Sequence, residues 1–193
     1  MIYFADDFLS KQWYESTAEE LSSNEFKEVV VGDRSFYVQP PSEAFNEIVS
    51  SKISLLEGAP VKNILSFFRV ATNLLDTDWD IHSDLKINGE QPNRAIVLFM
   101  SPSQSESELS GTAFWTHKEH GYKLSNNTSN EEYDKVLQRD SNDKDKWELN
   151  TVIGHKENRL ISYPSSYFHS KYPNKSWEDG RVVFVMFYSH GQE

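Results

Sequence analysis

The chain has 193 residues, of which 37% are hydrophobic and none is cysteine, and its formal net charge at pH 7 is −11. This length and apolar fraction support one substantial core, so we expect residues 1–193 to form a single domain. The lack of cysteine excludes a disulfide scaffold, a thiolate metal site and a cysteine nucleophile. The negative charge argues against binding to nucleic acid or to anionic membranes.

The first residues of the chain carry no basic stretch followed by a long apolar run, and no apolar run approaches the length of a membrane span. We therefore expect a soluble cytoplasmic protein. Its expected partner is a peptide or a small molecule, and its oligomeric state is left open by the sequence.

Residues 1–62 are interpreted as an N-terminal support region. Two strands are predicted at residues 28–31 and 35–38, around the turn Gly32-Asp33. A helix is predicted near residues 42–57, with Ser42 as its N-cap. Apolar residues recur in this helix at spacings near three and four, which predicts one face that packs against a sheet.

Residues 63–190 are rich in short segments with strand character, separated by turn signals. These segments are residues 65–72, 79–87, 94–100, 112–116, 147–153, 159–163, 167–170 and 181–189. Short strands without intervening helices favour a double-sheet jelly roll over a parallel α/β sheet. The expected fold is therefore mainly β (α+β), a jelly-roll core with supporting N-terminal helices.

Two polar stretches interrupt this core, near residues 101–110 and 118–146. Their composition is typical of long loops. Such loops either shape the entry of a substrate or are simply solvated insertions, and the sequence does not choose between these roles.

The stretch Trp79-Asp80-Ile81-His82-Ser83-Asp84 contains a His and an Asp two residues apart. On a strand, such residues point to the same face. His169, in a later strand, can complete a triad of two histidines and one carboxylate, which leaves positions open on Fe(II) for a chelating co-substrate and O₂. Arg181 begins an apolar strand twelve residues later, where it could receive the far carboxylate of a dicarboxylate co-substrate.

At these residues the chain resembles the 2-oxoglutarate- and Fe(II)-dependent dioxygenases, in particular their prolyl 4-hydroxylase-like branch. The likeness extends over residues 67–188, and it includes Gly111-Thr112-Ala113-Phe114 and the apolar strand that leads to His169. It implies a double-stranded β-helix, a jelly roll of the cupin type. It also implies that His82, Asp84 and His169 hold Fe(II), and that Arg181 pairs with the C5 carboxylate of 2-oxoglutarate.

The implied reaction uses O₂ and 2-oxoglutarate, releases succinate and CO₂, and hydroxylates a C–H bond. The substrate would be a peptide, with a prolyl peptide as one candidate, or a small molecule.

The chain departs from the pattern of this branch at two positions. The branch commonly places one Tyr shortly before the His-x-Asp motif and another in the strand that follows, and both donate hydrogen bonds to the co-substrate. Here the corresponding residues are Thr72 or Asn73 and then Phe99. Phenylalanine cannot donate such a bond. This difference favours the alternative of a cupin-like metal-binding jelly roll, an isomerase or a ligand-binding module, without oxygenase activity.

Several side chains allow two interpretations. His117 and His120 are three residues apart and could ligate a metal, or they could be ordinary loop histidines. Trp79 and Trp115 flank the motif strands and could form walls of the metal pocket, or they could be core residues.

His169 and Arg181, the two later residues of the motif, could instead have purely structural roles. His169 could be a core imidazole bonded to a backbone carbonyl. Arg181 could form a structural ion pair with Glu178 or Asp179.

Overall fold

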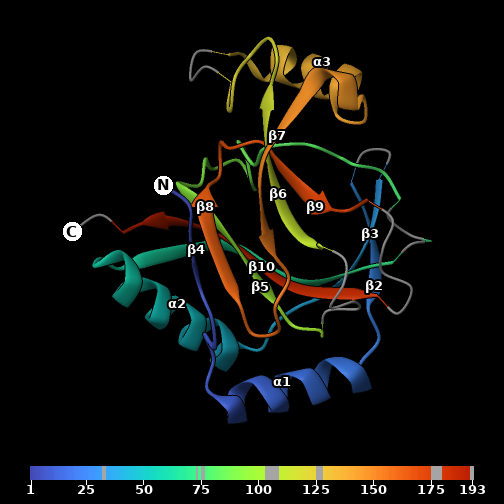
Figure 1. Cartoon of the computed structure of the whole chain (residues 1–193). Coiled ribbons are helices and arrows are strands. Elements are labelled where there is room, and N and C mark those ends of the chain that lie inside the picture. Colours follow the sequence, from blue (N-terminus) through green and yellow to red (C-terminus); the bar gives the residue numbers. More distant parts are fainter. Residues whose placement is uncertain are drawn as a thin grey trace.

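The computed structural model describes residues 1–31, 34–72, 74, 77–102, 109–124, 128–174 and 180–191. Their strands belong to two antiparallel sheets (Figure 1). The strands of the larger sheet are β1 (Tyr3–Ala5), β2 (Lys27–Val31), β3 (Arg34–Gln39), β4 (Val61–Ala71), β5 (Arg94–Phe99), β8 (Leu160–Pro164) and β10 (Arg181–His190). The strands of the smaller sheet are β6 (Gly111–His117), β7 (Trp147–Gly154) and β9 (His169–Tyr172).

The strand order is β1-β8-β5-β10-β4-β3-β2 in the larger sheet and β7-β6-β9 in the smaller one. Side chains from both sheets meet in a shared core, which includes Phe99 and Val183 from the larger sheet and Phe114 from the smaller. The predicted mainly β jelly roll is therefore confirmed.

Strand β10 separates two layers of the core, because successive side chains of a strand point to opposite faces. Val183 and Phe187 face the smaller sheet. Phe184 and Met186 face the opposite way, toward the helices. Arg181 lies two residues before Val183, so its side chain is directed to the space between the sheets.

Helices α1 (Lys11–Ser23) and α2 (Glu43–Glu57) cover the outer face of the larger sheet (Figure 1). Helix α2 confirms the helix predicted near residues 42–57. The Ser42 hydroxyl caps it by accepting from the Phe45 N–H at 3.2 Å. The Phe45 ring packs against Phe68 and Phe184, with ring centroids 5.0 Å apart in both pairs.

The predicted polar loop at residues 118–146 is structured. It contains helix α3 (Asn130–Asp140) and the short 3₁₀ helix Lys144–Lys146. Helix α3 lies at the end of the molecule opposite α1 (Figure 1). Its residues Tyr133 and Leu137 pack against a third cluster that includes Trp147 and Phe168, and Val136 is buried as well. The loop prediction was wrong because these few apolar residues, three and four positions apart, are surrounded by charged ones.

Three strand predictions need correction or extension. The predicted strand at residues 79–87 is absent. Within this segment His82 forms an isolated bridge to His169 of β9, and Ile87 forms one to Glu90. Strand β4 begins at Val61 rather than at Leu65, and β1 was not predicted. The turn Gly32-Asp33 and most of the insertion predicted at residues 101–110 lie outside the described residues.

Within the described ranges, none of the helices has the length and apolar character needed to cross a membrane.

Candidate metal centre

The segment that carries His82 and Asp84 is fixed to β9 through backbone hydrogen bonds. The His82 N–H donates to the His169 carbonyl at 3.0 Å, and the His169 N–H donates to the His82 carbonyl at 2.8 Å. The Asp84 N–H donates to the Ser165 carbonyl at 2.7 Å. A single bridge thus replaces the predicted strand, and it still places the two side chains of the motif beside His169.

The insertion that contains α3 supports this segment from the other side. The hydroxyl of Tyr133 donates to the Ser83 carbonyl, between the two residues of the motif. The Ile81 N–H donates to the Ser141 carbonyl at 3.0 Å, and the Asp80 N–H donates to the Asn142 side chain at 2.9 Å. The motif is therefore held between β9 and the insertion.

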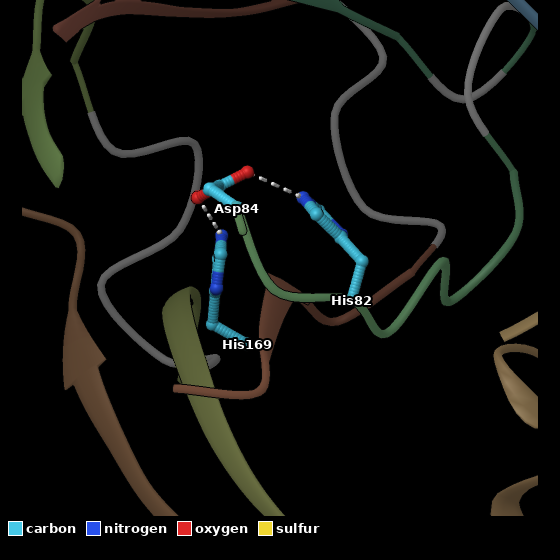
Figure 2. A group of neighbouring side chains, drawn as sticks. All are labelled: His82, Asp84 and His169. Atoms are coloured by element: carbon cyan, nitrogen blue, oxygen red, sulfur yellow. Dashed lines mark ion pairs between the residues drawn. The ribbon is translucent and has the colours of Figure 1, made fainter. Parts of the chain in front are cut away.

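The side chains of His82, Asp84 and His169 converge (Figure 2). The Nε2 atom of His82 lies 3.6 Å from Oδ1 of Asp84, and Nε2 of His169 lies 3.4 Å from Oδ2. The three ligand atoms lie within 4.8 Å of one another. Among the residues that the structure describes, these three form the only group of at least three His, Asp or Glu side chains with such proximity.

The Asp84 carboxylate fits a bound cation. Its Oδ2 atom is buried and accepts no hydrogen bond from any described residue. A buried carboxylate oxygen without a partner is costly, and a cation between the three side chains would remove this cost. Two imidazoles and one carboxylate are the ligand set of non-haem Fe(II) sites.

Backbone carbonyls fix the tautomers of both histidines. Nδ1 of His82 lies 2.6 Å from the Asp80 carbonyl, and Nδ1 of His169 lies 2.9 Å from the Tyr167 carbonyl. A carbonyl only accepts hydrogen bonds, so each Nδ1 carries the proton and each Nε2 presents its lone pair to the centre. Burial lowers the pKa of His169 to about 4, so this imidazole is neutral at pH 7, which is the form that binds metals.

A cavity of about 720 Å³ adjoins the three side chains. Much of its wall is apolar and comes from the larger sheet, including Phe36 and Phe67. Arg181 also lines the cavity, although it is only 7% exposed. Its Nη2 atom donates to the Thr112 hydroxyl at 3.3 Å, and its guanidinium lies 5.1 Å from the centre of the Phe99 ring. A buried cation and the candidate metal ligands thus share one cavity.

The alternative ion pair of Arg181 with Glu178 or Asp179 falls on residues outside the described ranges.

Tyr163 is a residue of this cavity that the sequence reading took for a core or rim aromatic residue and assigned no catalytic role. Its hydroxyl lies 3.1 Å from Nε2 of His169, and the residue is 1% exposed. The alternation of strand β8 could have indicated that Tyr163 points inward. Nothing in the sequence marks which inward-pointing aromatic residue contacts the candidate metal ligands.

His117 has a structural role away from this centre. Its Nε2 donates to Oδ2 of the buried Asp140 at 3.0 Å. Its Nδ1 accepts from the N–H groups of Glu119 and His120, at 3.1 and 3.2 Å. Both ring nitrogens of His117 are thus bonded to residues of the insertion. His117 is the last residue of β6 and is buried, so it is a structural strand residue rather than the predicted loop histidine.

The two tryptophans that flank the motif strands differ in position. Trp79 lines the cavity. Trp115 is 2% exposed, belongs to the third core cluster and donates from Nε1 to the Ser170 hydroxyl at 2.9 Å. Of the two, Trp79 is therefore the wall residue.

Comparisons with solved structures place this fold among those of 2-oxoglutarate-dependent enzymes. HygX from Streptomyces hygroscopicus, with nickel and 2-oxoglutarate bound, aligns with a TM-score of 0.60 and 13% identity over 98% of this chain and 82% of its own. SnoK, a non-heme alpha ketoglutarate dependent carbocyclase from nogalamycin biosynthesis, gives 0.64 and 13%, over 97% and 78%. A prolyl-4-hydroxylase from Pseudomonas putida gives 0.55 and 11%, over 99% and 93%.

At these identities the likeness concerns the fold, and the jelly roll of the family suggested by the sequence is confirmed.

The sequence itself matches a family model. Residues 34–176 match DUF6445, a family of unknown function, and the chain belongs to this family. Among curated proteins, none matches the chain.

Proposed function

We propose that the protein is an Fe(II)- and 2-oxoglutarate-dependent dioxygenase that hydroxylates a C–H bond of a peptide or a small molecule. The observation that carries this proposal is the convergence of two Nε2 lone pairs and one carboxylate in a cavity that also contains the buried Arg181. The structures of HygX with 2-oxoglutarate and of a prolyl-4-hydroxylase support it, since both have this fold.

In this proposal His82, Asp84 and His169 hold Fe(II) from one side and leave its other positions to 2-oxoglutarate and O₂. When bound, the metal and the co-substrate supply the oxidant through oxidative decarboxylation, which releases succinate and CO₂. Arg181 pairs its guanidinium with the C5 carboxylate of 2-oxoglutarate, because a planar fork of donors matches a carboxylate. The apolar walls around these residues exclude water and orient the substrate.

The substrate class is proposed from the structural neighbours alone. A peptide, including a prolyl peptide, is suggested by the likeness to the prolyl-4-hydroxylase, whereas HygX has been crystallised with hygromycin B and points to a small molecule. Hydroxylation is proposed as the outcome, although neighbours of the same fold include an epimerase and a carbocyclase.

Anaerobic titration with Fe(II) and then with 2-oxoglutarate tests the proposal. A keto acid that chelates Fe(II) gives a weak visible charge-transfer band, which we expect for the unchanged chain. We expect Asp84→Ala to lose the band and most of its Fe(II) affinity, because the only anionic ligand of the triad is removed. Asp134→Ala, which removes an exposed carboxylate from α3, serves as the matched control.

Full Fe(II) affinity in Asp84→Ala would refute the triad. Metal binding by the unchanged chain without the band, and without O₂ consumption that depends on 2-oxoglutarate, would favour the cupin-like alternative.

A further inference from the structure

We propose that Tyr163 binds the co-substrate, by donating a hydrogen bond to the carboxylate at the metal-chelating end of 2-oxoglutarate. This inference rests on the proposed function. Its starting observation is that the buried Tyr163 hydroxyl lies 3.1 Å from Nε2 of His169, the nitrogen that faces the candidate metal position.

The direction of this hydrogen bond follows from the other ring nitrogen. Nδ1 of His169 donates to the Tyr167 carbonyl, so Nε2 has no proton and can only accept. The Tyr163 hydroxyl is therefore the donor. Nε2 has a single lone pair in the ring plane, and a metal ion would use the same lone pair. Metal binding thus removes the acceptor from the Tyr163 hydroxyl.

The hydroxyl then needs another acceptor. Tyr163 is 1% exposed, so bulk water does not reach it, and a buried donor without a partner is unfavourable. Within the described part of the chain the hydroxyl has no hydrogen-bond partner besides His169. Asp84 already directs its two oxygens at the two imidazoles, where the metal would bind.

The chelating co-substrate provides the missing acceptor. It would bring a carboxylate to the metal, beside Nε2 of His169, and hydrogen bonds to an ionised acceptor are the stronger kind. Arg181 is the candidate partner of the other carboxylate, so the two residues would hold opposite ends of the same molecule. Tyr163 thus selects for a 2-oxo acid that chelates the metal, and Arg181 selects for its second carboxylate.

Tyr163 supplies a hydroxyl donor at a position other than the two where the family resemblance led us to expect one. Phe99, in β5, packs its ring between the guanidinium of Arg181 and the ring of His155, and it has no hydroxyl to offer. Strand β8 pairs with β5 and carries Tyr163 opposite Ala95. The hydroxyl donor is thus supplied by the neighbouring strand of the same sheet.

Tyr163→Phe tests the inference, with Tyr188→Phe as the matched control. Tyr188 is also fully buried, but its hydroxyl bonds Glu57 on the face covered by α2. Both variants are titrated anaerobically with Fe(II), and the Fe(II)-loaded proteins then with 2-oxoglutarate. We expect Tyr163→Phe to weaken 2-oxoglutarate binding roughly tenfold or more and to shift the charge-transfer maximum, because a charge-assisted hydrogen bond is lost.

The Fe(II) affinity of Tyr163→Phe is the second readout. We expect it to be unchanged or higher, since the hydroxyl no longer competes for Nε2. Phenylalanine keeps the ring that packs edge-on against Phe114, with centroids 5.2 Å apart, and near-UV circular dichroism checks that the fold is retained. Tyr163→Met is a second variant without the hydroxyl, and the same loss of 2-oxoglutarate affinity is expected for it.

Unchanged 2-oxoglutarate affinity and an unshifted band in Tyr163→Phe would overturn the inference while the proposed function stands. Weaker Fe(II) binding with normal 2-oxoglutarate binding would also overturn it, because Tyr163 would then only orient His169. If the unchanged chain gives no band, the proposed function fails, and the inference fails with it.

Discussion

Arg181 is the residue whose position most restricts what the cavity can bind. Its guanidinium lies between the Phe99 ring and the Thr112 hydroxyl and lines the cavity, and its planar fork of donors matches a carboxylate. The cavity contains Asp84 near the candidate metal position, so the site offers an anion-binding group and a cation-binding group in one space. A dicarboxylate that also chelates a metal satisfies both.

We expect Arg181→Met to raise the concentration of 2-oxoglutarate required for binding and turnover, with Fe(II) affinity retained. Loss of one charge-assisted pair corresponds to about 1.5–3 kcal/mol, or roughly a tenfold to hundredfold weaker affinity. The dissociation constant from the charge-transfer titration and the co-substrate dependence of O₂ consumption measure the effect. Arg159→Met is the control, since Arg159 pairs with Asp6.

A co-substrate dependence of Arg181→Met equal to that of the unchanged chain would remove Arg181 from the site.

At the residue scale, the sequence indicated the triad and Arg181 because each belongs to a spaced motif. It did not indicate Tyr163 or the carbonyls of Asp80 and Tyr167, which orient the two imidazoles. Those contacts depend on where the backbone turns, and residue type does not encode that directly.

At the scale of elements, strand β6 of the smaller sheet carries both a close contact with β7 and a residue that contacts Arg181. Gly111 begins this strand opposite Gly154 of β7, and the next residue, Thr112, contacts Arg181. A Cβ atom on Gly111 would lie 2.0 Å from the carbonyl oxygen of Ile153. Only glycine allows the two strands to approach this closely, so Gly111 determines the position of β6 relative to β7.

We expect Gly111→Ala to destabilise the fold by about 1–3 kcal/mol, the usual cost of overpacking, because backbone rather than a flexible side chain must move. Urea unfolding measures the change in the free energy of unfolding. Gly154→Ala is a matched control from the paired position, where the nearest atom to a new Cβ would lie 3.8 Å away. Equal stability of the two variants would contradict the close approach.

The elements that the sequence predicted correctly have a nearly continuous apolar run or a clear cap, such as β10 and helix α2. Helix α3 was missed because its buried face is only a few residues wide. The strand predicted at residues 79–87 was wrong for a different reason. Its residues make isolated hydrogen bonds to β9 and to the insertion. These bonds do not continue into a β-ladder, so the segment is not a strand.

At the scale of the whole molecule, the buried ionisable groups outside the cavity influence stability against pH. Burial, helped by the charges of Arg181 and Arg159, lowers the pKa of His155 to about 4. Its Nε2 bonds the Ser101 carbonyl and its ring stacks on Phe99, so protonation would place a second buried cation beside Arg181. Mainly the ion pair with Arg139, and then the bond from His117, lower the pKa of Asp140 to about 2.

We therefore expect the free energy of unfolding to fall in two stages as the pH decreases. The unfolded chain binds the His155 proton near pH 6.5 and the folded chain near pH 4, so stability is lost between these values. The contribution of Asp140 is lost between about pH 4 and pH 2. Thermal unfolding followed across this range measures both stages.

The variants His155→Phe and Asp140→Asn identify how much each residue contributes to its stage of the stability loss. His155→Phe should reduce the loss of stability between pH 6.5 and 4, to which His169 also contributes. Asp140→Asn should reduce the loss between about pH 4 and 2, to which Asp6 also contributes. A His155→Phe variant with the same slope between pH 6.5 and 4 would show that other groups cause the loss.

The contacts from the insertion to residues 80, 81 and 83 connect the insertion to the segment that carries His82 and Asp84. The candidate metal ligands His82 and Asp84 lie on a segment that forms no β-ladder, and helix α3 and the turn that follows it border this segment on its outer side. Shortening the insertion would remove the hydrogen bonds on one side of residues 80–84, while the backbone bonds of His82 to β9 would remain. The length and packing of this surface insertion therefore determine how rigid the candidate metal centre is in the metal-free protein.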